Sequence, residues 1–261
     1  MNTPVHIVKF GSGILDDPVK RDAALRQMQD AAHNIVLVHG GGERAGELSA
    51  RLGLETIKHD GRRVTDADTL EVVVMVYAGL INKQLVAELQ ALGLDALGLS
   101  GADMDILRAR RRPPQPIDFG FVGDVERVNA GALEMLLRRG ITPVVCALTH
   151  DGAGQLLNTN ADTIAAEIAA ALATQRPCCL SYCFDLPGVL RDLSDAGSLI
   201  DELDAARYAQ LKREGRIHRG MLPKLDNAFA AHAAGVNAVN ICAYEALHAA
   251  LNGARVGTSI V

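Results

Sequence analysis

The stretch Ile35-Val36-Leu37-Val38-His39-Gly40-Gly41-Gly42 decides the fold prediction, and Glu43-Arg44-Ala45-Gly46-Glu47-Leu48 follows it directly. A short apolar run rich in β-branched residues ends in three glycines, after which a helical pattern begins. The stretch therefore predicts a buried parallel strand, a tight turn and the N-terminus of a helix. Glycine lets a ligand approach the backbone closely, and the N–H groups of such a turn favour a negative charge together with the helix dipole. Three successive glycines favour an anion-binding turn at residues 39–42 over an ordinary connection.

A second strand of the same kind lies near the start of the sequence. Residues Val5 to Val8 form a predicted strand, which delivers Lys9 into the turn Phe10-Gly11-Ser12-Gly13. In open parallel sheets, ligands gather at the carboxyl ends of the strands. A lysine at such an end either extends into solvent or points at a ligand. Its combination with the first glycine turn favours a lysine directed at a phosphate.

The composition predicts a globular protein of the cytoplasm. The 261 residues are 49% hydrophobic with a mean hydropathy of +0.12, and no apolar run is long enough to span a bilayer. A net charge of −5 gives no general attraction to nucleic acid or to acidic membranes. The cysteines lack CxxC spacing and lie mostly in apolar runs, which indicates buried reduced thiols and no metal site. They are Cys146, Cys178, Cys179, Cys183 and Cys242.

Strand and helix patterns alternate along the whole sequence without a linker rich in proline or serine. The further predicted strands are Ala96–Leu99, Gly120–Val125, Thr142–Leu148, Cys178–Phe184 and Ala238–Cys242. The predicted helices are Asp22–Ala32, Arg44–Leu52, Thr65–Leu92, Gly131–Arg139 and Ala161–Ala173. This alternation predicts an α/β protein with a three-layer α/β/α architecture, doubly wound around a mainly parallel sheet, in which residues 1–261 form a single domain.

The helix predicted over Thr65–Leu92 is apolar on more than one face. Thr65 and Asp68 resemble a capping box at its start, with Asp in place of the usual Glu or Gln. A single buried stripe needs fewer apolar positions than this helix has. We therefore expect a second face to pack on another copy of the chain, and we predict a homodimer through this helix.

The sequence fits the motifs of several common enzyme and cofactor-binding classes poorly. In a dinucleotide-binding motif, Asp16 would stand where the third glycine after Gly11 and Gly13 belongs. No lysine precedes Ser or Thr as a Walker A loop requires, and the lipase-like His39-Gly40-Gly41-Gly42 has no G-x-S-x-G partner. The basic run Arg108–Pro114 is expected to be a solvated loop or edge hairpin. Glycine turns, separated lysines, an asparagine pair and an aspartate suit phosphoryl transfer, which needs positive charge and little covalent help from the protein.

A set of short motifs then resembles one known family. The motifs are Val8-Lys9-Phe10-Gly11, Val38-His39-Gly40-Gly41-Gly42, Gly61-Arg62-Arg63-Val64-Thr65, Asn82-Lys83, Gly98-Leu99-Ser100-Gly101, Asn158-Thr159-Asn160-Ala161-Asp162, Asp185-Leu186-Pro187-Gly188-Val189-Leu190 and Gly220-Met221-Leu222-Pro223-Lys224. In this order they resemble the amino-acid kinase family over nearly the whole chain. The resemblance implies transfer of a phosphoryl group from ATP to the γ-carboxylate of an N-acyl-L-glutamate. It also implies an acyl-amino-acid and dimerisation half at residues 1–175 and a nucleotide half at residues 176–261.

The resemblance implies roles for individual residues on the acceptor side. Lys9 and Lys224 would flank the transferred phosphoryl group, and Asp162 would hold both lysines in place. Backbone amides at Gly11, Gly41 and Gly42 would donate to the phosphoryl group and to the acceptor carboxylate. Arg63 would bind the α-carboxylate of the substrate, with Asn158 and Asn160 as further substrate-binding residues.

On the nucleotide side, the resemblance implies that Mg²⁺ travels with the phosphates of ATP. The backbone at Gly11 and Ser12 would contact the phosphates. The other residues implied for the ATP pocket are Asp185, Gly188, Val189, Leu190, Arg216, Ile217, His218 and Met221. The family usually has two adjacent glycines after its first lysine, whereas Ser12 takes the second place here; a serine amide can still donate.

Three alternatives remain open in the sequence. The acyl group can be acetyl or succinyl, and the extra carboxylate of a succinyl group needs a cation that Arg62, Lys83 or Arg108 could supply. A sibling kinase acting on aspartate, glutamate, carbamate or UMP would share the lysines but not the surroundings of Arg63 and Asn158. A non-catalytic sensor on the same fold is expected to lose Lys9, Lys224 or Asp162, and all three are present.

Overall fold

The computed structural model describes residues 3–31, 34–59, 62–217 and 219–261. By its internal contacts the chain divides into two compact units. Unit 1 comprises Met1–Ile35 and Ala165–Val261, and unit 2 comprises Val36–Ile164. The motifs predicted for nucleotide binding lie in unit 1, together with Lys9, and the motifs predicted for the acyl amino acid lie in unit 2.

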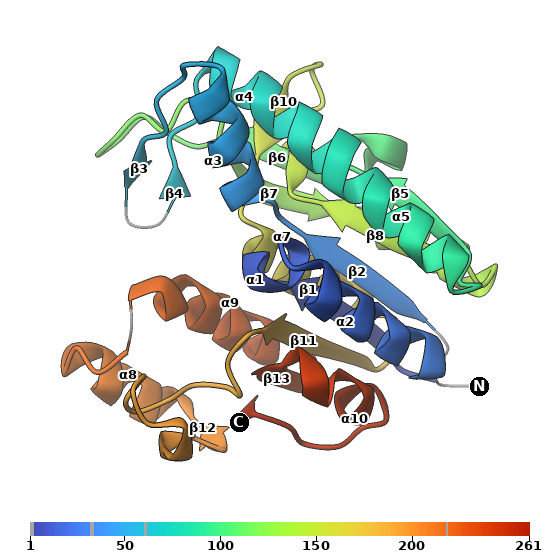
Figure 1. Cartoon of the computed structure of the whole chain (residues 1–261), viewed down its shortest axis with the longest axis vertical. Helices are drawn as coiled ribbons and strands as arrows, with labels where there is room; N and C mark the ends of the chain where they lie inside the picture. The colour runs from blue at the N-terminus through green and yellow to red at the C-terminus, as the bar shows by residue number, and fades with distance from the viewer. Residues whose placement is uncertain (1–2, 32–33, 60–61, 218) are drawn as a thin grey trace. The chain divides into compact units, whose positions relative to one another are not determined.

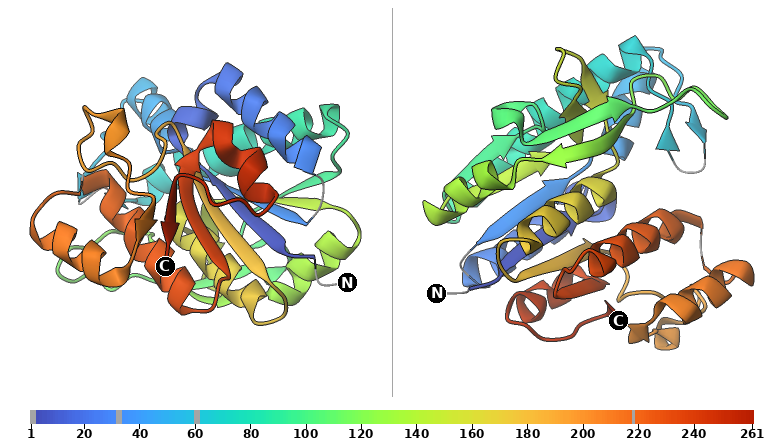
Figure 2. Two further views of the ribbon diagram at one scale, coloured as in Figure 1. Left: turned by 90° about the horizontal axis from the view of Figure 1, so that it is seen from below. Right: turned by 180° about the vertical axis from the view of Figure 1, so that it is seen from behind.

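Unit 1 contains a mainly parallel sheet with helices on both faces. Its strands are β1 (Val5–Phe10), β11 (Cys178–Phe184), β12 (Glu202–Leu203), β13 (Ala238–Ala243) and β14 (Thr258–Ile260), in the order β12-β14-β13-β11-β1. Only β14 runs antiparallel to its neighbour β13. Helices α2 (Pro18–Ala31) and α10 (Leu247–Leu251) contact each other on one face, and α9 (Leu222–Ala233) covers the other (Figure 2, left). The remaining helices include α1 (Ser12–Leu15) and α8 (Ala205–Arg213).

Unit 2 contains a parallel sheet and a separate four-stranded sheet. Strands β2 (Ile35–His39), β8 (Thr142–Cys146) and β5 (Ala96–Leu99) are parallel, and helices α5 (Asn82–Ala91) and α6 (Ala130–Arg138) both contact β8. The second sheet has the order β10-β9-β6-β7. Its strands are β6 (Leu107–Arg111), β7 (Gly123–Val128), β9 (Leu148–His150) and β10 (Leu156–Asn158). Strands β6 and β7 are the paired green strands in Figure 2 (right). Strands β3 (Lys58–His59) and β4 (Arg62–Arg63) of the same unit form a separate antiparallel pair.

The long apolar helix is one continuous element of three parts. It consists of α4 (Ala67–Val74), a π-helical segment η1 (Met75–Ile81) and α5 (Figure 1). Residues Ala67–Ala91 meet the length and hydropathy criteria for a membrane span, but 44% of the most apolar window is buried within the protein. A core helix of a soluble protein meets the same criteria, so these criteria do not identify a membrane segment.

The capping prediction for this helix was wrong by one residue. Asp66 is the N-cap, because its side chain accepts a hydrogen bond of 2.8 Å from the backbone N–H of Thr69. Thr65 is instead fully buried and forms an isolated bridge with Gly120. The side chain of Thr65, which was predicted to cap the helix, is therefore available for another contact.

The predictions of buried free cysteines and of an α/β fold class are confirmed. All five cysteines are free, and each is buried except Cys179, which is partly exposed. The buried core is aliphatic apart from a few aromatic side chains such as Phe10 and Tyr182. Strand β11 has the predicted bounds, whereas the predicted strand Thr142–Leu148 divides into β8 and the start of β9.

Candidate active site

The glycine turn after β2 has a geometry that only glycine adopts. Gly41 has φ +155° and ψ +26° and caps helix α3 (Gly42–Arg51). A methyl group at Gly41 would lie 2.4 Å from Ile81 Cδ1 and 2.9 Å from Tyr77 Cδ1. The first N–H groups of α3 have no acceptor within the helix, so the turn presents donors to an anion.

His39 supports this turn as a neutral, buried side chain. Its Nδ1–H donates to Gly40 O at 2.8 Å, which leaves Nε2 to accept from Asn82 Nδ2 at 3.1 Å. Burial lowers the pKa of His39 to about 4, so the ring carries no charge at neutral pH. Asn82 also donates to Val144 O at 2.8 Å. The His39-Asn82 pair therefore joins the glycine turn to α5 and β8, and His39 does not act as a base.

Acid is expected to destabilise the protein through His39. Because folding lowers the pKa of His39 from 6.5 to about 4, its contribution is fully present above pH 6.5 and is lost as the pH falls toward 4. Between about pH 7.5 and pH 4.5 this group should remove roughly 2 to 3 kcal/mol from the free energy of unfolding. Urea denaturation of the wild type and of His39→Gln at both pH values measures the difference. Equal losses in the two proteins would contradict the assignment to His39.

A chain of hydrogen bonds connects the glycine turn with Arg63 and Asn158. Arg63 donates from Nη2 to Gly42 O at 2.7 Å and from Nη1 to Thr56 Oγ1 at 2.9 Å. Thr65 Oγ1 donates to Arg63 O at 3.2 Å and accepts from Asn158 Nδ2 at 3.0 Å. Three residues predicted to bind the substrate, Gly42, Arg63 and Asn158, therefore belong to one network in unit 2. Thr65 links them, and the sequence analysis had assigned it only a capping role.

Asn160 and Asp162 lie at the start of α7 (Ala161–Ala173). Asn160 Oδ1 accepts hydrogen bonds from the backbone N–H groups of Asp162 and Thr163, at 2.7 and 3.1 Å. This oxygen is therefore used as a helix cap. Asp162 is buried in the first turn of the same helix.

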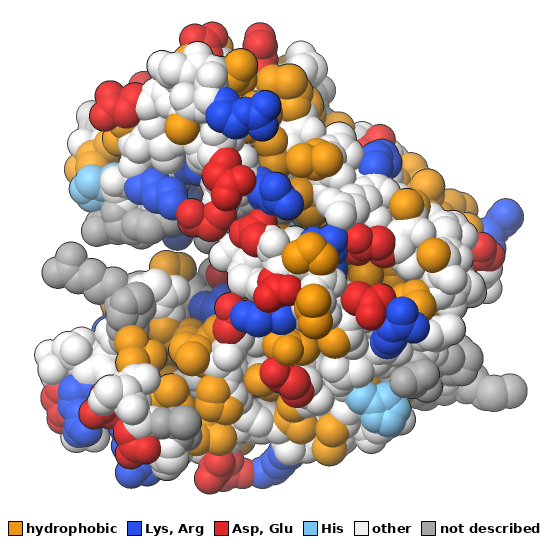
Figure 3. Space-filling view, in the orientation of Figure 1, with side chains coloured by type: hydrophobic (Ala, Val, Ile, Leu, Met, Phe, Trp, Pro, Cys, Tyr) orange, Lys and Arg blue, Asp and Glu red, His pale blue; other side chains and the backbone are white. Residues whose placement is uncertain are grey.

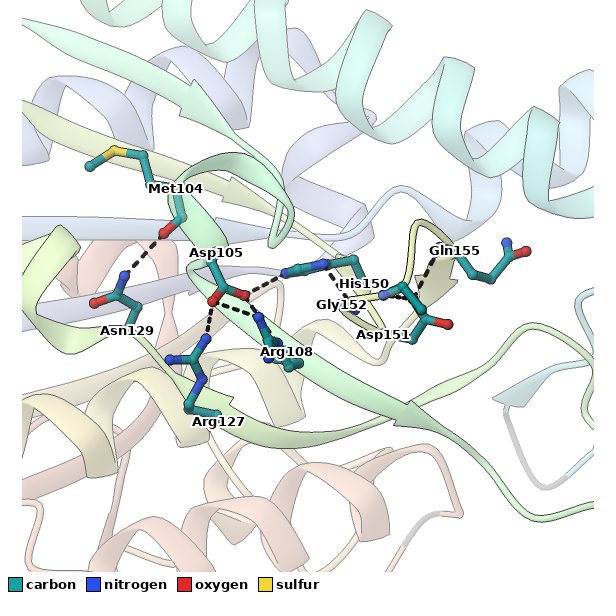
Figure 4. Close-up of polar contacts among 10 residues, drawn as sticks. Met104, Asp105, Arg108, Arg127, Asn129, His150, Asp151, Gly152 and Gln155 are labelled. Atoms are coloured by element: carbon teal, nitrogen blue, oxygen red, sulfur yellow. Dashed lines mark hydrogen bonds and ion pairs between the residues drawn. The ribbon is translucent and has the colours of Figure 1, made fainter.

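The basic residues proposed for an acyl carboxylate already have partners. Arg108 donates to Asp105 at 3.3 and 2.9 Å, and Asp105 also binds Arg127 and His150 (Figure 4). Lys83 donates to Asn82 Oδ1 and to Gly98 O, both at 3.2 Å. Arg62 is half-buried in β4 and also has a polar or electrostatic contact. Other arginines of the basic run pair with carboxylates: Arg110 with Glu126, Arg111 with Asp118, and Arg112 with Asp124.

Unit 1 brings the two predicted lysines toward the same part of β11. Lys9 is in β1 opposite Tyr182, and the Nζ atom of Lys224, in the first turn of α9, lies 5.3 Å from the centroid of the Tyr182 ring. The hydrogen bond with Cys242 and burial raise the pKa of Cys183, while the charges of Lys224 and Lys9 oppose this rise. Both ammonium groups therefore act on one thiol at the carboxyl end of β11.

The Gly11 N–H, which is predicted to contact the phosphoryl group, donates to Cys183 O at 2.9 Å within the protein. The strand pairing of β1 with β11 continues to Gly11 and uses its donor. Ser12 and Gly13 occupy the first positions of α1, where backbone N–H groups have no acceptor within the helix. The donors next to Lys9 are thus shifted by one residue along the chain.

Most of the residues predicted for the nucleotide line a single cavity of about 470 Å³ in unit 1. These are Gly188, Val189, Leu190, Arg216, Ile217 and Met221. Asp185 does not line this cavity; it lies against Gly13 and pairs with Lys20 at 3.5 Å. His218 lies outside the described residues. The size and mixed polarity of the cavity suit a ligand such as a nucleotide.

Comparison with known proteins identifies the family. The sequence profile of the amino acid kinase family matches residues 4–242. The chain belongs to the amino acid kinase family. Within this family, it is 49% identical over 259 residues to an acetylglutamate kinase from Cytophaga hutchinsonii, covering 98% of each chain. It is 42% identical over 247 residues to an acetylglutamate kinase from Methanopyrus kandleri, covering 93% of this chain and 96% of the relative.

Solved structures agree with the amino acid kinase fold. The protein smu.665 from Streptococcus mutans superimposes with a TM-score of 0.81 at 25% identity, covering 98% of both chains. A carbamate kinase from Giardia has a TM-score of 0.72 at 14% identity, covering 100% of this chain and 99% of its own, and shows a shared fold alone. The predicted fold class is confirmed.

Proposed function

We propose that this amino acid kinase catalyses the ATP-dependent phosphorylation of the γ-carboxylate of N-acetyl-L-glutamate in arginine biosynthesis. The products are N-acetyl-L-glutamyl 5-phosphate and ADP, and the reaction takes place in the cytoplasm. The observation that carries the proposal is the similarity, over nearly the full length, to acetylglutamate kinases from distant organisms. The network from Gly42 through Arg63 and Thr65 to Asn158 supports it, because it provides cationic and amide groups beside an anion-binding turn.

The proposed chemistry needs no general base. A carboxylate acceptor is ionised at neutral pH, so catalysis consists of positioning the reactants and stabilising the charge of the moving phosphoryl group. We assign that stabilisation to Lys9 and Lys224, and Asp162 keeps the role implied by the family resemblance, the orientation of the two lysines. Neutral His39 stabilises the glycine turn and takes no part in proton transfer.

ATP enters the proposed reaction as its magnesium complex. The cavity lined by Gly188, Val189, Leu190 and Ile217 is the proposed nucleotide pocket. Among the described residues, no group of three or more His, Cys, Asp and Glu side chains could hold a metal ion. In the proposal Mg²⁺ enters as part of the substrate, held by the phosphates.

N-Succinyl-L-glutamate is the alternative acceptor. Its additional carboxylate requires a cation, and the pairing of Arg108 with Asp105 disfavours this one of the three candidates. ADP release from MgATP tests both possibilities, with N-acetyl-L-glutamate and N-succinyl-L-glutamate compared against free L-glutamate, L-aspartate and carbamate. Turnover with a free amino acid or carbamate, and with neither acylglutamate, would assign the chain to a sibling kinase.

We also propose that the protein is a homodimer through the helix formed by α4, η1 and α5. Met75 and Leu80 of this helix are 51% and 56% exposed. Figure 3 shows hydrophobic side chains on the face of the molecule where this helix lies. Large apolar side chains that are exposed on a helix whose other large apolar side chains are mostly buried are typical of a subunit interface.

Leu80→Glu is expected to weaken the dimer about 100-fold, because it places a charge within the proposed apolar interface. Sedimentation analysis at micromolar concentration should show a dimer for the wild type and a monomer for the variant. Val19→Glu is the matched control, because Val19 is an exposed apolar residue on α2. A monomeric wild type would contradict the proposed dimer.

A further inference from the structure

Tyr77 lies against the glycine turn in the π-helical segment η1. Its ring packs on Gly41, where a methyl group would lie 3.1 Å from Tyr77 Cε1. Its hydroxyl lies 3.8 Å from the position that a methyl group would take at Gly42. π-Helical segments occur frequently at functional sites. Here the segment places a phenol beside the proposed substrate-binding donors.

The hydroxyl of Tyr77 has no hydrogen-bond partner within the described part of the chain, although the residue is only 6% exposed. A buried tyrosine hydroxyl normally has a partner. In the same described residues, fully buried side-chain atoms without a partner, such as His6 Nδ1, form a separate group. The Tyr77 oxygen is not among them and therefore keeps some accessible surface. A small ligand at the turn can reach it.

The electrostatic surroundings make this hydroxyl a hydrogen-bond donor toward an anion. Burial raises the pKa of Tyr77 to about 12, so the proton is retained at neutral pH. The positive charge of Arg63 opposes this rise, which shows that the guanidinium acts on the phenol. Two of the donor positions of Arg63 are already used by Gly42 O and Thr56 Oγ1. A carboxylate has about four acceptor sites, and a neighbouring hydroxyl can fill a site that Arg63 leaves open.

We propose that Tyr77 is a substrate-binding residue whose hydroxyl donates a hydrogen bond to the α-carboxylate of the acylglutamate bound by Arg63. This inference rests on the proposed function, which supplies the acylglutamate. It assigns the ring and the hydroxyl separate tasks. The ring fixes the glycine turn, and the hydroxyl recognises the ligand.

Tyr77→Phe separates these tasks because it keeps the ring and removes only the hydroxyl. The KM for N-acetyl-L-glutamate should rise about 10-fold, since a hydrogen bond to a charged group is lost. The KM for MgATP should stay unchanged. The melting temperature should not fall, because the deleted hydroxyl has no partner in the protein. With N-acetyl-L-glutamate α-amide, which lacks the α-carboxylate charge, the difference between wild type and variant should largely disappear.

Tyr208→Phe is the matched control in the other unit. The hydroxyl of Tyr208 donates to Asp226 at 2.6 Å, so its removal should lower the melting temperature and leave the KM for N-acetyl-L-glutamate unchanged. The inference would be overturned if Tyr77→Phe kept the wild-type KM for N-acetyl-L-glutamate. It would also be overturned if the variant raised the KM for the α-amide by the same factor as the KM for N-acetyl-L-glutamate.

Calorimetric titration with N-acetyl-L-glutamate distinguishes this inference from the proposed function. If the wild type binds N-acetyl-L-glutamate without turnover, the proposed function is contradicted, but the inference about Tyr77 is not. The ratio of Kd values for the wild type and Tyr77→Phe then decides the role of Tyr77, with a 10-fold ratio supporting it and equal values overturning it. If the wild type does not bind N-acetyl-L-glutamate, both are overturned.

Discussion

Replacement of Lys224 by alanine is expected to lower kcat for N-acylglutamate phosphorylation about 1,000-fold. Lys224 is only 9% exposed, and its ammonium group lies 5.3 and 5.7 Å from the centroids of the Tyr182 and Phe184 rings. A cation held in such a partly desolvated position stabilises the charge of a moving phosphoryl group much more strongly than one in water. Lys9→Ala should have an effect of similar size, because Lys9 is equally buried and faces Tyr182 from β1.

Lys212→Ala provides a control with a similar local contact. Its ammonium group also lies 5.3 Å from a tyrosine ring centroid, that of Tyr208, but it is exposed and pairs with Asp226. Steady-state kinetics should show near wild-type kcat for this variant. Loss of kcat in Lys9→Ala and Lys224→Ala, with the KM for the acylglutamate little changed, would indicate a role in the chemical step. Unchanged turnover in both variants would contradict the proposed mechanism.

Gly41→Ala is expected to destabilise the protein by about 4 kcal/mol, by combining backbone strain with overpacking. The backbone at Gly41 has φ +155°, and the added methyl group would overlap the Tyr77 ring and the end of Ile81. The Tyr77 ring and Ile81 are themselves buried, so they have little room to move aside. The acylglutamate site should be lost together with stability, because the same turn carries its backbone donors.

Gly53→Ala separates the cost of backbone strain from the cost of overpacking. Gly53 also has a positive φ of +74°, but no atom lies within 4 Å of a methyl group placed there. Only the backbone cost remains, and the free energy of unfolding should fall by about 1 kcal/mol. Urea denaturation of both variants measures these values. Equal losses at the two sites would show that the contacts with Tyr77 and Ile81 do not matter.

The regular parts of the fold could be predicted from local patterns. Continuous apolar runs such as Cys178–Phe184 and Ile35–His39 became buried strands because parallel strands covered on both faces need such runs. Strand β14 (Thr258–Ile260) and strand β12 (Glu202–Leu203) were missed. Each is too short to show a period, and each is defined by its pairing partner in unit 1.

In the candidate site, too, the sequence predicted some features and not others. The types and order of the motif residues indicated Arg63, Asn158 and both lysines, but hydrogen-bond partners depend on the folded backbone. The pairing of β1 with β11 uses the Gly11 amide, and Thr65 is held in an extended bridge instead of capping a helix. Tyr77 lies within the apolar run of the long helix. The only signal that could have singled it out is its phenolic oxygen within that otherwise aliphatic run.

The most direct test of the central claim identifies the phosphorylated product. Purified protein is incubated with MgATP and either N-acetyl-L-glutamate or N-succinyl-L-glutamate, and hydroxylamine traps any acyl phosphate as a hydroxamate. We expect the γ-hydroxamate of N-acetyl-L-glutamate to form in proportion to ADP, and none to form from free L-glutamate. If only N-succinyl-L-glutamate gives a hydroxamate, the acceptor is N-succinyl-L-glutamate instead of N-acetyl-L-glutamate. ADP release without any hydroxamate, or no reaction with either acylglutamate, would contradict the assignment as an acylglutamate kinase.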